Sequence, residues 1–249
     1  MTESNRAIVS TDEMTAEVEA WPAATGSIHR VVVVRGSMND AADALVKAYP
    51  AGTALLADRE DLAAALEDLG GVRVRHLHAM HHHLDAIPDD VLAGHMRLRP
   101  WQLGDAESLS HVLVGAYGPG HPDAGSGDLA AAASSLQRTV NDPDNPLIET
   151  ATQVAMHDGD AVGAALVVRS DHVRGFTGPW LMNVFRSPAP ATRGAGAGMI
   201  VAALRSLRES NEERLGLAVT HTNVAARAVY ERLGFEYTFE GWVVVTPGR

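Results

Sequence analysis

Three glycines alternate with other residues in a short segment that leads directly into an apolar run. They are Gly194, Gly196 and Gly198, and the apolar run covers residues 199–204. Glycine lets a ligand approach the backbone closely, and the first N–H groups of a helix have no partner within the helix. The helix dipole and the neighbouring Arg193 add positive charge. The segment therefore predicts an anion-binding turn of the kind that binds phosphate.

Spacing narrows the class of phosphate ligand. A nucleoside-triphosphate loop of the form G-x-x-x-x-G-K-[ST] needs a lysine, and the only lysine of the chain is Lys47, far from this segment. The dinucleotide fingerprint G-x-G-x-x-G needs a third glycine where the chain has Met199 or Val201, depending on which glycine is counted first. Both patterns fail on this segment.

A second informative segment follows in residues 215–235. Leu215, Leu217 and Val219 alternate like one buried face of a strand. Asn223 is a favourable helix N-cap, and glycine at position 234 suits the left-handed end of a helix. We therefore expect a strand followed by a helix. Tyr230 falls within this helix, where the periodicity fits a core aromatic as well as a functional phenol.

Taken together, the two segments resemble the GNAT N-acetyltransferase superfamily. Arg193, Gly196 and Gly198 form the pattern Arg-x-x-Gly-x-Gly, which resembles the family's acetyl-CoA-binding motif. The second segment resembles the family motif Asn-x-x-Ala-x-x-x-Tyr, closed by Leu-Gly-Phe at residues 233–235. The resemblance covers residues 96–249 and implies an α/β fold of the α+β type, with a mixed and splayed central sheet.

The resemblance also implies how acetyl-CoA would bind. The pyrophosphate would lie on the glycine turn, and the pantetheine arm would lie between two splayed strands that end at residues 184–186 and 219–220. The loop 187–192 is longer than the common family loop, which leaves the register between strand and cofactor open by two positions. The implied cofactor-binding residues are Val184, Phe185, Arg186, Arg193, Gly194, Ala195, Gly196, Ala197, Gly198, Asn223, Ala226 and Tyr230.

The implied reaction is transfer of the acetyl group to a primary amine, by direct attack in a ternary complex. Such an amine, with a pKa of about 10.4, must lose a proton before it attacks, and the departing thiolate benefits from an acid. Tyr230 matches the acid of the family. Relatives often place a base on the fourth strand, yet residues 176–186 contain no carboxylate and Asn183 stands there instead. We take Glu149, assisted by water, as the substitute base, with a solvated strand end as the alternative interpretation.

The missing strand carboxylate leaves a second function open, a non-catalytic acyl-CoA-binding sensor or regulatory module. Both functions require the cofactor, and turnover would separate them. The loop 117–123 either lines the acceptor pocket, as its position in the family implies, or is only a turn rich in Gly and Pro. No motif names the acceptor, so a small molecule, a peptide N-terminus, a lysine side chain and an antibiotic all stay open.

The pattern of elements changes near residues 87–88. We predict a loop or short helix at 1–28, a small domain of β-α-β-α-β order at 29–95, and a GNAT acetyltransferase domain at 96–249. Some GNAT relatives carry a degenerate acyltransferase-like half before the complete domain. The elements expected in the small domain are strands 31–34, 54–57 and 72–77 and helices 39–48 and 58–69. The elements expected in the GNAT-like part are strands 96–101, 148–156, 161–168, 180–186, 215–220 and 237–245 and helices 105–113 and 128–140, besides the two helices described above.

Composition sets the outer limits. The chain has 249 residues and 46% hydrophobic residues, enough for one large or two small domains. It has no cysteine, which excludes disulfides, thiolate catalysis and cysteine-bound zinc. The net charge of −11 argues against a nucleic-acid partner. No apolar run approaches the ~20 residues of a membrane span, and no signal-peptide pattern begins the chain, so we expect a cytoplasmic protein without a membrane partner. A homodimer is compatible with this, and no pattern sets the oligomeric state.

Histidines gather in residues 76–83. Zinc or nickel binding is conceivable there, because alternate residues share a strand face. Asp85 is the only nearby carboxylate in the sequence, and we favour a polar strand edge or loop with no metal. The histidines concerned are His76, His78, His81, His82 and His83.

Overall fold

The computed structural model describes residues 6–23, 26–89, 92–124, 127–173 and 176–248, and it divides the chain into two compact units. Unit 1 comprises Met1–Ala79 and Thr238–Arg249, and unit 2 comprises Met80–Tyr237. The sequence prediction drew the boundary at residue 95 and gave the whole C-terminus to the second domain. Within the described ranges, no helix combines the length and the apolar character needed to span a bilayer.

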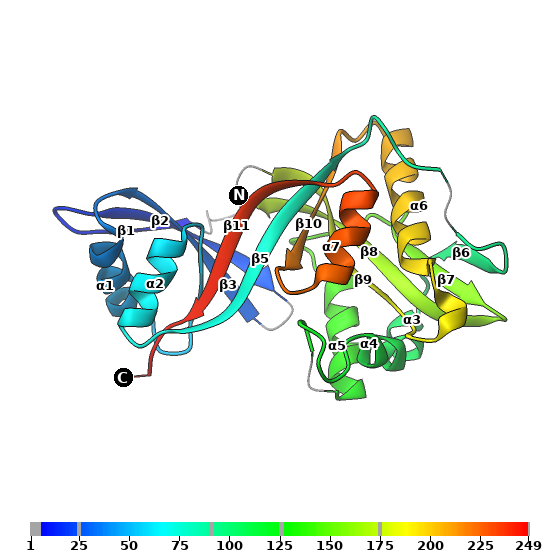
Figure 1. Ribbon diagram of the computed structural model, residues 1–249, viewed down its shortest axis with the longest axis horizontal. Helices are drawn as coiled ribbons and strands as arrows, with labels where there is room; N and C mark the ends of the chain where they lie inside the picture. Colours follow the sequence, from blue (N-terminus) through cyan, green and yellow to red (C-terminus); the bar gives the residue numbers. More distant parts are fainter. Residues whose placement is uncertain (1–5, 24–25, 90–91, 125–126, 174–175, 249) are drawn as a thin grey trace. The chain divides into compact units, whose positions relative to one another are not determined.

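Unit 1 is a sheet covered by helices. Its elements are β1 Arg6–Ser10, β2 Thr15–Ala23, β3 Gly26–Arg35, α1 Met38–Ala48, β4 Ala54–Ala57, α2 Glu60–Asp68, most of β5 Val72–His83 and most of β11 Glu236–Val245. The strands follow the order β1-β2-β3-β4-β11-β5, in which β3 and β4 are parallel and β11 is antiparallel to β4. Helices α1 and α2 lie side by side (Figure 1) and bury Leu45, Leu62 and Leu66 against the strands.

The structure corrects the prediction for residues 1–28, which contain the antiparallel strands β1 and β2 rather than a loop or short helix. Met14, Ala16 and Val18 are buried on one face, and Glu17 and Glu19 alternate with them. Buried and exposed positions therefore alternate as in a strand. Few of these residues are β-branched, so the usual sequence signature of a strand is weak. The other elements predicted for this part are confirmed, and β5 runs six residues further than expected, to His83.

Unit 2 is a larger sheet with helices on both faces. Its elements are the end of β5, β6 Met96–Pro100, α3 Asp105–Ser108, α4 Ser110–Ala116, α5 Leu129–Val140, β7 Gln153–His157, β8 Asp160–Val173, β9 Phe176–Arg186, the 3-10 turn η1 Pro190–Thr192, α6 Ala195–Glu209, β10 Arg214–Thr220, α7 Val224–Arg232 and the start of β11. The strands follow the order β5-β10-β9-β8-β7-β6. Only the pair β9 and β10 is parallel among the pairs from β6 to β10.

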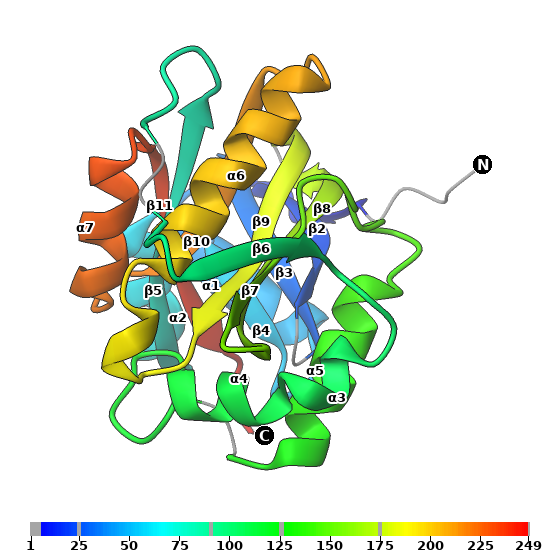
Figure 2. The same cartoon turned by 90° about the vertical axis from the view of Figure 1, so that its right-hand side faces the viewer.

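Alternate residues of β8 build two cores. Ala164 and Leu166 pack on one face with helices α3, α4 and α5, whereas Ala165 and Val167 pack on the other face with α6. Figure 2 shows α6 running over the strands, with α3, α4 and α5 gathered elsewhere. The part of a central strand that is buried on both faces requires apolar or small residues, as residues 161–168 of β8 are.

Local sequence signals predicted much of unit 2 correctly. Residues 157–160 form a two-residue hairpin between β7 and β8, in which Asp158 and Gly159 both have positive φ. The predicted strand 148–156 is wrong in its first half, because residues 149–151 form a turn and β7 begins only at Gln153. Thr152 explains the late start, since its hydroxyl bonds both the N–H and the C=O of Val167 and takes the place of a backbone pair.

Candidate functional site

The glycine turn joins β9 to α6 in unit 2. Gly194 is the N-cap residue of α6 with φ 92°, a left-handed conformation that favours glycine. The first bond inside the helix runs from the N–H of Gly198 to the C=O of Gly194, at 2.9 Å. The N–H groups of Ala195, Gly196 and Ala197 therefore precede the hydrogen-bonded part of the helix. No acidic side chain lies in the first turn of α6, and Arg193 beside it is exposed.

The three glycines have three different environments. Gly194 supplies the left-handed backbone. A Cβ on Gly196 would meet no other heavy atom within 4 Å, so the space beside this residue is open. A Cβ on Gly198 would lie 2.7–3.2 Å from atoms of Leu92, so this glycine admits a neighbouring chain segment rather than a ligand. The open side of the turn is therefore at Gly196.

The long loop before the turn is held by its own hydrogen bonds. Thr192 is buried, and its hydroxyl donates toward the carbonyls of Ser187 at 2.6 Å and Ala189 at 2.9 Å. The Arg186 guanidinium binds the Ser187 carbonyl at 2.7 Å and the Thr192 hydroxyl at 3.1 Å. The extra loop residues thus form a fixed support for the start of α6.

The pairing between strands β9 and β10 ends close to this turn. Their parallel register joins Gly216 to Trp180 and Leu217 to Leu181, and it ends there. On the other edge of β9, the register with β8 shifts so that Met182 is an extra residue between Leu181 and Asn183. The backbone of β9 beyond Leu181 thus has no register pair on β10, which is the splay that the resemblance implied.

The loop between α4 and α5 closes over the splayed ends. The Tyr117 hydroxyl donates to Asn183 Oδ1 at 3.0 Å and to the Val184 carbonyl at 3.3 Å. At the other strand, the Thr220 hydroxyl donates to Asp123 Oδ1 at 2.5 Å. The loop 117–123 thus bridges the ends of both strands and brings a carboxylate to the end of β10.

Tyr230 of α7 lies close enough to Asp123 for the charge of this carboxylate to act on its phenol. Its side chain is 8% exposed, and its ring lies 5.8 Å from that of Phe235, centroid to centroid. Burial raises the pKa of Tyr230 far above its ordinary value, and the charge of Asp123 raises it further. The phenol is therefore protonated across the physiological pH range and can donate a hydrogen bond.

The remaining predicted residues have the following places. The Asn223 side chain caps α7 by accepting from the Ala226 N–H at 3.2 Å, as predicted for a helix N-cap. Phe185 is buried in the core beneath α4 and α5. Glu149 is exposed in the turn before β7. The cofactor and catalytic roles of these residues stay predictions.

Sequence reasoning missed the individual polar residues of the bridge, which are Tyr117, Asp123 and Thr220. It singled out the loop 117–123 as a possible acceptor lining but assigned no role within it. Asp123 and Thr220 are 97 positions apart, so no local pattern connects them. The available signals were the position of the loop in the family and its Gly and Pro content.

Comparison with known proteins agrees with this geometry. Residues 126–235 match the sequence model of the acetyltransferase (GNAT) family. A search of curated proteins finds no match. The fold is similar to that of a GCN5-related N-acetyltransferase from Sphaerobacter thermophilus, with TM-score 0.64 and 15% identity over 95% of this chain and 82% of the other.

Two further solved structures extend the comparison. A GCN5-related N-acetyltransferase from Kribbella flavida has TM-score 0.60 and 16% identity, over 98% of this chain and 91% of its own. A tandem GNAT protein from the clavulanic acid biosynthesis pathway has TM-score 0.51 and 14% identity, over 98% of this chain and 83% of its own. The match over residues 126–235 and the similarity of the fold support a relationship to the GNAT superfamily.

The raised pKa of Tyr230 predicts a specific loss of stability at high pH. In the unfolded chain a tyrosine ionises near pH 10, whereas the folded chain holds this proton more tightly. The stabilising contribution is therefore complete below about pH 10 and decreases as the pH rises above that value. Relative to Tyr230→Phe, the wild type should lose about 1.4 kcal/mol of unfolding free energy between pH 8 and pH 11.

Urea unfolding of both proteins at the two pH values measures this difference. Tyr237→Phe is the matched control, because that side chain is 44% exposed. An equal difference between wild type and Tyr230→Phe at both pH values would contradict the prediction.

Proposed function

We propose that this protein is an acetyl-CoA-dependent N-acetyltransferase that acts on a primary amine. The observation that carries the proposal is the parting of β9 and β10 beside an open helix N-terminus, with Tyr230 and Asp123 at the same strand ends. The family match supports acyl transfer in general, and the geometry of these residues supports the finer assignment.

The glycine turn fits the pyrophosphate of coenzyme A. The N–H groups of Ala195, Gly196 and Ala197 and the guanidinium of Arg193 would hold it, and Gly196 leaves the space that it requires. Beyond Leu181, the β9 backbone would pair with the amides of the pantetheine arm. Acetyl-CoA supplies the acyl group in activated form, as a thioester.

The corresponding helix of unit 1 lacks this capacity. Helix α1 also follows a left-handed glycine, Gly36, but its N-terminus is already occupied. Ser37 accepts from the Asp40 N–H at 3.1 Å, and Asp40 places a negative charge in the first turn. An anion would be repelled there, so we assign the cofactor to unit 2 alone.

Two groups of the chain divide the proton chemistry. Tyr230 keeps its proton until the sulfur gains negative charge, and it then donates to the departing thiolate. Asp123, held by Thr220, receives the proton that the attacking nitrogen loses. We place this role on Asp123 rather than on the predicted Glu149, because Asp123 acts electrostatically on Tyr230 whereas Glu149 lies in an exposed turn.

The substitution Gly196→Glu tests whether the glycine turn binds the pyrophosphate. A carboxylate beside the turn would repel the pyrophosphate, so we expect the affinity for acetyl-CoA to fall about tenfold or more, which is about 1.4 kcal/mol. Calorimetric titration measures the affinity, and thermal unfolding reports whether the fold is intact. Gly196→Ala is the matched control, since its Cβ would touch no other heavy atom within 4 Å. Unchanged affinity in Gly196→Glu would remove this assignment.

Tyr230→Phe tests the acid. The phenyl ring keeps the packing and loses the donor, so kcat should fall about 100-fold while the affinity for acetyl-CoA stays within about twofold. Release of coenzyme A thiol with a panel of primary amines measures turnover, and Tyr237→Phe is the control. Equal losses of kcat and affinity would indicate a packing role instead.

Asp123→Asn tests the base. We expect kcat to fall about 100-fold or more, with the affinity for acetyl-CoA retained, because the amide keeps the shape but accepts no proton. Glu149→Gln is measured in parallel, with the exposed Glu107→Gln as control. Loss of kcat in Glu149→Gln without loss in Asp123→Asn would return the role to Glu149. If the protein binds acetyl-CoA but releases no coenzyme A thiol with any amine in the panel, the alternative function, a non-catalytic acyl-CoA-binding sensor, is favoured.

A further inference from the structure

The histidines at the end of β5 separate onto two faces of the strand. His82 is buried, and its ring lies 5.3 Å from that of Phe235. His81 and His83 lie on the opposite face, with ring centroids 4.4 Å apart and Nε2 atoms 2.8 Å apart. Strand alternation produces this arrangement, because positions two apart share a face.

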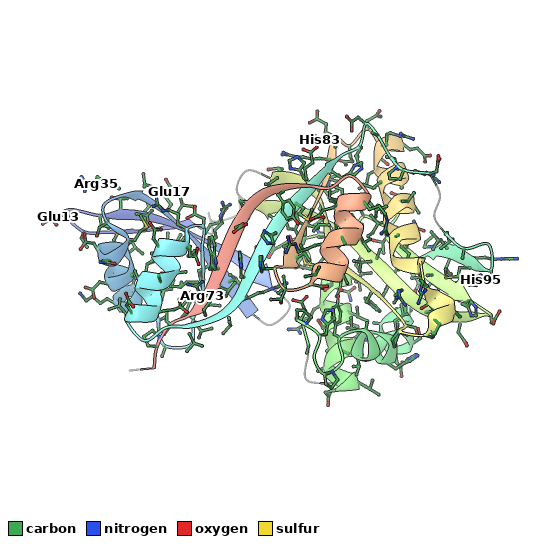
Figure 3. The ribbon with its side chains drawn as sticks, viewed as in Figure 1. Glu13, Glu17, Arg35, Arg73, His83 and His95 are labelled. Carbon is green, nitrogen blue, oxygen red and sulfur yellow. The ribbon has the colours of Figure 1, made fainter. Side chains whose placement is uncertain are left out.

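A carboxylate completes this group. Glu236 is the first residue of β11, the neighbour of β5 in the sheet, and it is exposed. One ligand atom from each of His81, His83 and Glu236 lies within 4.8 Å of the others. All three residues belong to unit 2. Figure 3 labels His83 at the end of its strand.

We propose that His81, His83 and Glu236 form a binding site for a divalent d-block cation, with Zn²⁺ as the reference ion. Two imidazoles and a carboxylate are a ligand set that zinc accepts, and water would fill the fourth position. Imidazole nitrogen also suits copper and nickel, whereas magnesium and calcium prefer sites of oxygen alone. The site lies on β5 and β11, on residues to which the proposed acyl transfer assigns no role.

The geometry requires only a small adjustment for a metal. Zinc–nitrogen bonds of 2.0–2.1 Å in a tetrahedral site separate two ligand nitrogens by about 3.3 Å. The imidazole nitrogens here lie at 2.8 Å, so small side-chain rotations at the strand end would admit the ion. Without a metal, one ring donates its Nε2–H to the Nε2 of the other. Binding of the ion through both Nε2 atoms requires that the donor ring carry its proton on Nδ1 instead.

Charged residues around the site have opposite effects on a bound cation. Glu236 offsets part of the charge of the ion, whereas Arg214 of β10 acts on His81 in the opposite sense. The other histidines of the cluster lie elsewhere. His76 lies 3.2 Å from Glu240 and stacks on Trp242 in unit 1. The histidines that are close in the sequence therefore belong to more than one group in the structure. The proposed metal site is the group formed by His81, His83 and Glu236.

Zinc titration of the full chain tests the proposal. The protein is prepared without a polyhistidine tag and stripped with EDTA, and Zn²⁺ binding is measured by calorimetry. We expect His83→Ala and Glu236→Gln each to lower the Zn²⁺ affinity of the tightest site at least about tenfold. Mutation of a residue that only hydrogen-bonds to a metal ligand already lowers metal affinity by about tenfold or more. His111→Ala removes an exposed histidine of α4 and should leave the affinity unchanged. Equal affinity in all four proteins would overturn the proposal.

A second measurement identifies the ligand atoms directly. Electron paramagnetic resonance with substoichiometric Cu²⁺ should show coupling to two imidazole nitrogens at the tightest site. A spectrum without two nitrogen ligands would overturn the assignment. Thermal unfolding should also shift upward with Zn²⁺ in the wild type and less in His83→Ala, because an ion that binds only the folded state stabilises it.

Discussion

The end of backbone pairing between β9 and β10 is the constraint on which the rest of unit 2 depends. A central strand must satisfy its N–H and C=O groups, and here the register stops at Leu181 and Leu217. The extra residue Met182 bends β9 at that point, and Tyr117 takes up the Val184 carbonyl. The β9 backbone beyond Leu181 thus has no register pair on β10, and the loop 117–123 contacts the ends of both strands.

The two units repeat one succession of elements with different chemistry at the corresponding helix. Each has three antiparallel strands that lead into a helix, then a strand parallel to the third and a second helix. In unit 1, Ser37 and Asp40 complete the N-terminus of α1, so the helix end is stable and closed to anions. In unit 2, Gly194 and Gly196 leave the N-terminus of α6 open. A few polar side chains thus separate a structural helix from a candidate binding helix.

The sequence predictions were most accurate for features that depend on interactions between residues close together in the chain. Caps were predicted correctly where one residue type determines the backbone, as at Asn223 and Gly234. The strands before residue 24 were missed, because their buried side chains are Met14, Ala16 and Val18, which lack the usual strand signature. Thr152 shortened β7 through a side-chain bond that competes with the backbone ladder.

The sequence by itself determined the helix N-terminus at the glycine turn and the helix capped by Asn223 that follows the next strand. These depend on φ preferences, capping and periodicity, which act over a few residues. Only the tertiary structure decided that Asp123 meets Thr220, that Leu92 covers Gly198, and that Glu236 stands beside His81 and His83. Those contacts join positions far apart in the chain, and the packing of loops, helices and strands against one another fixes them.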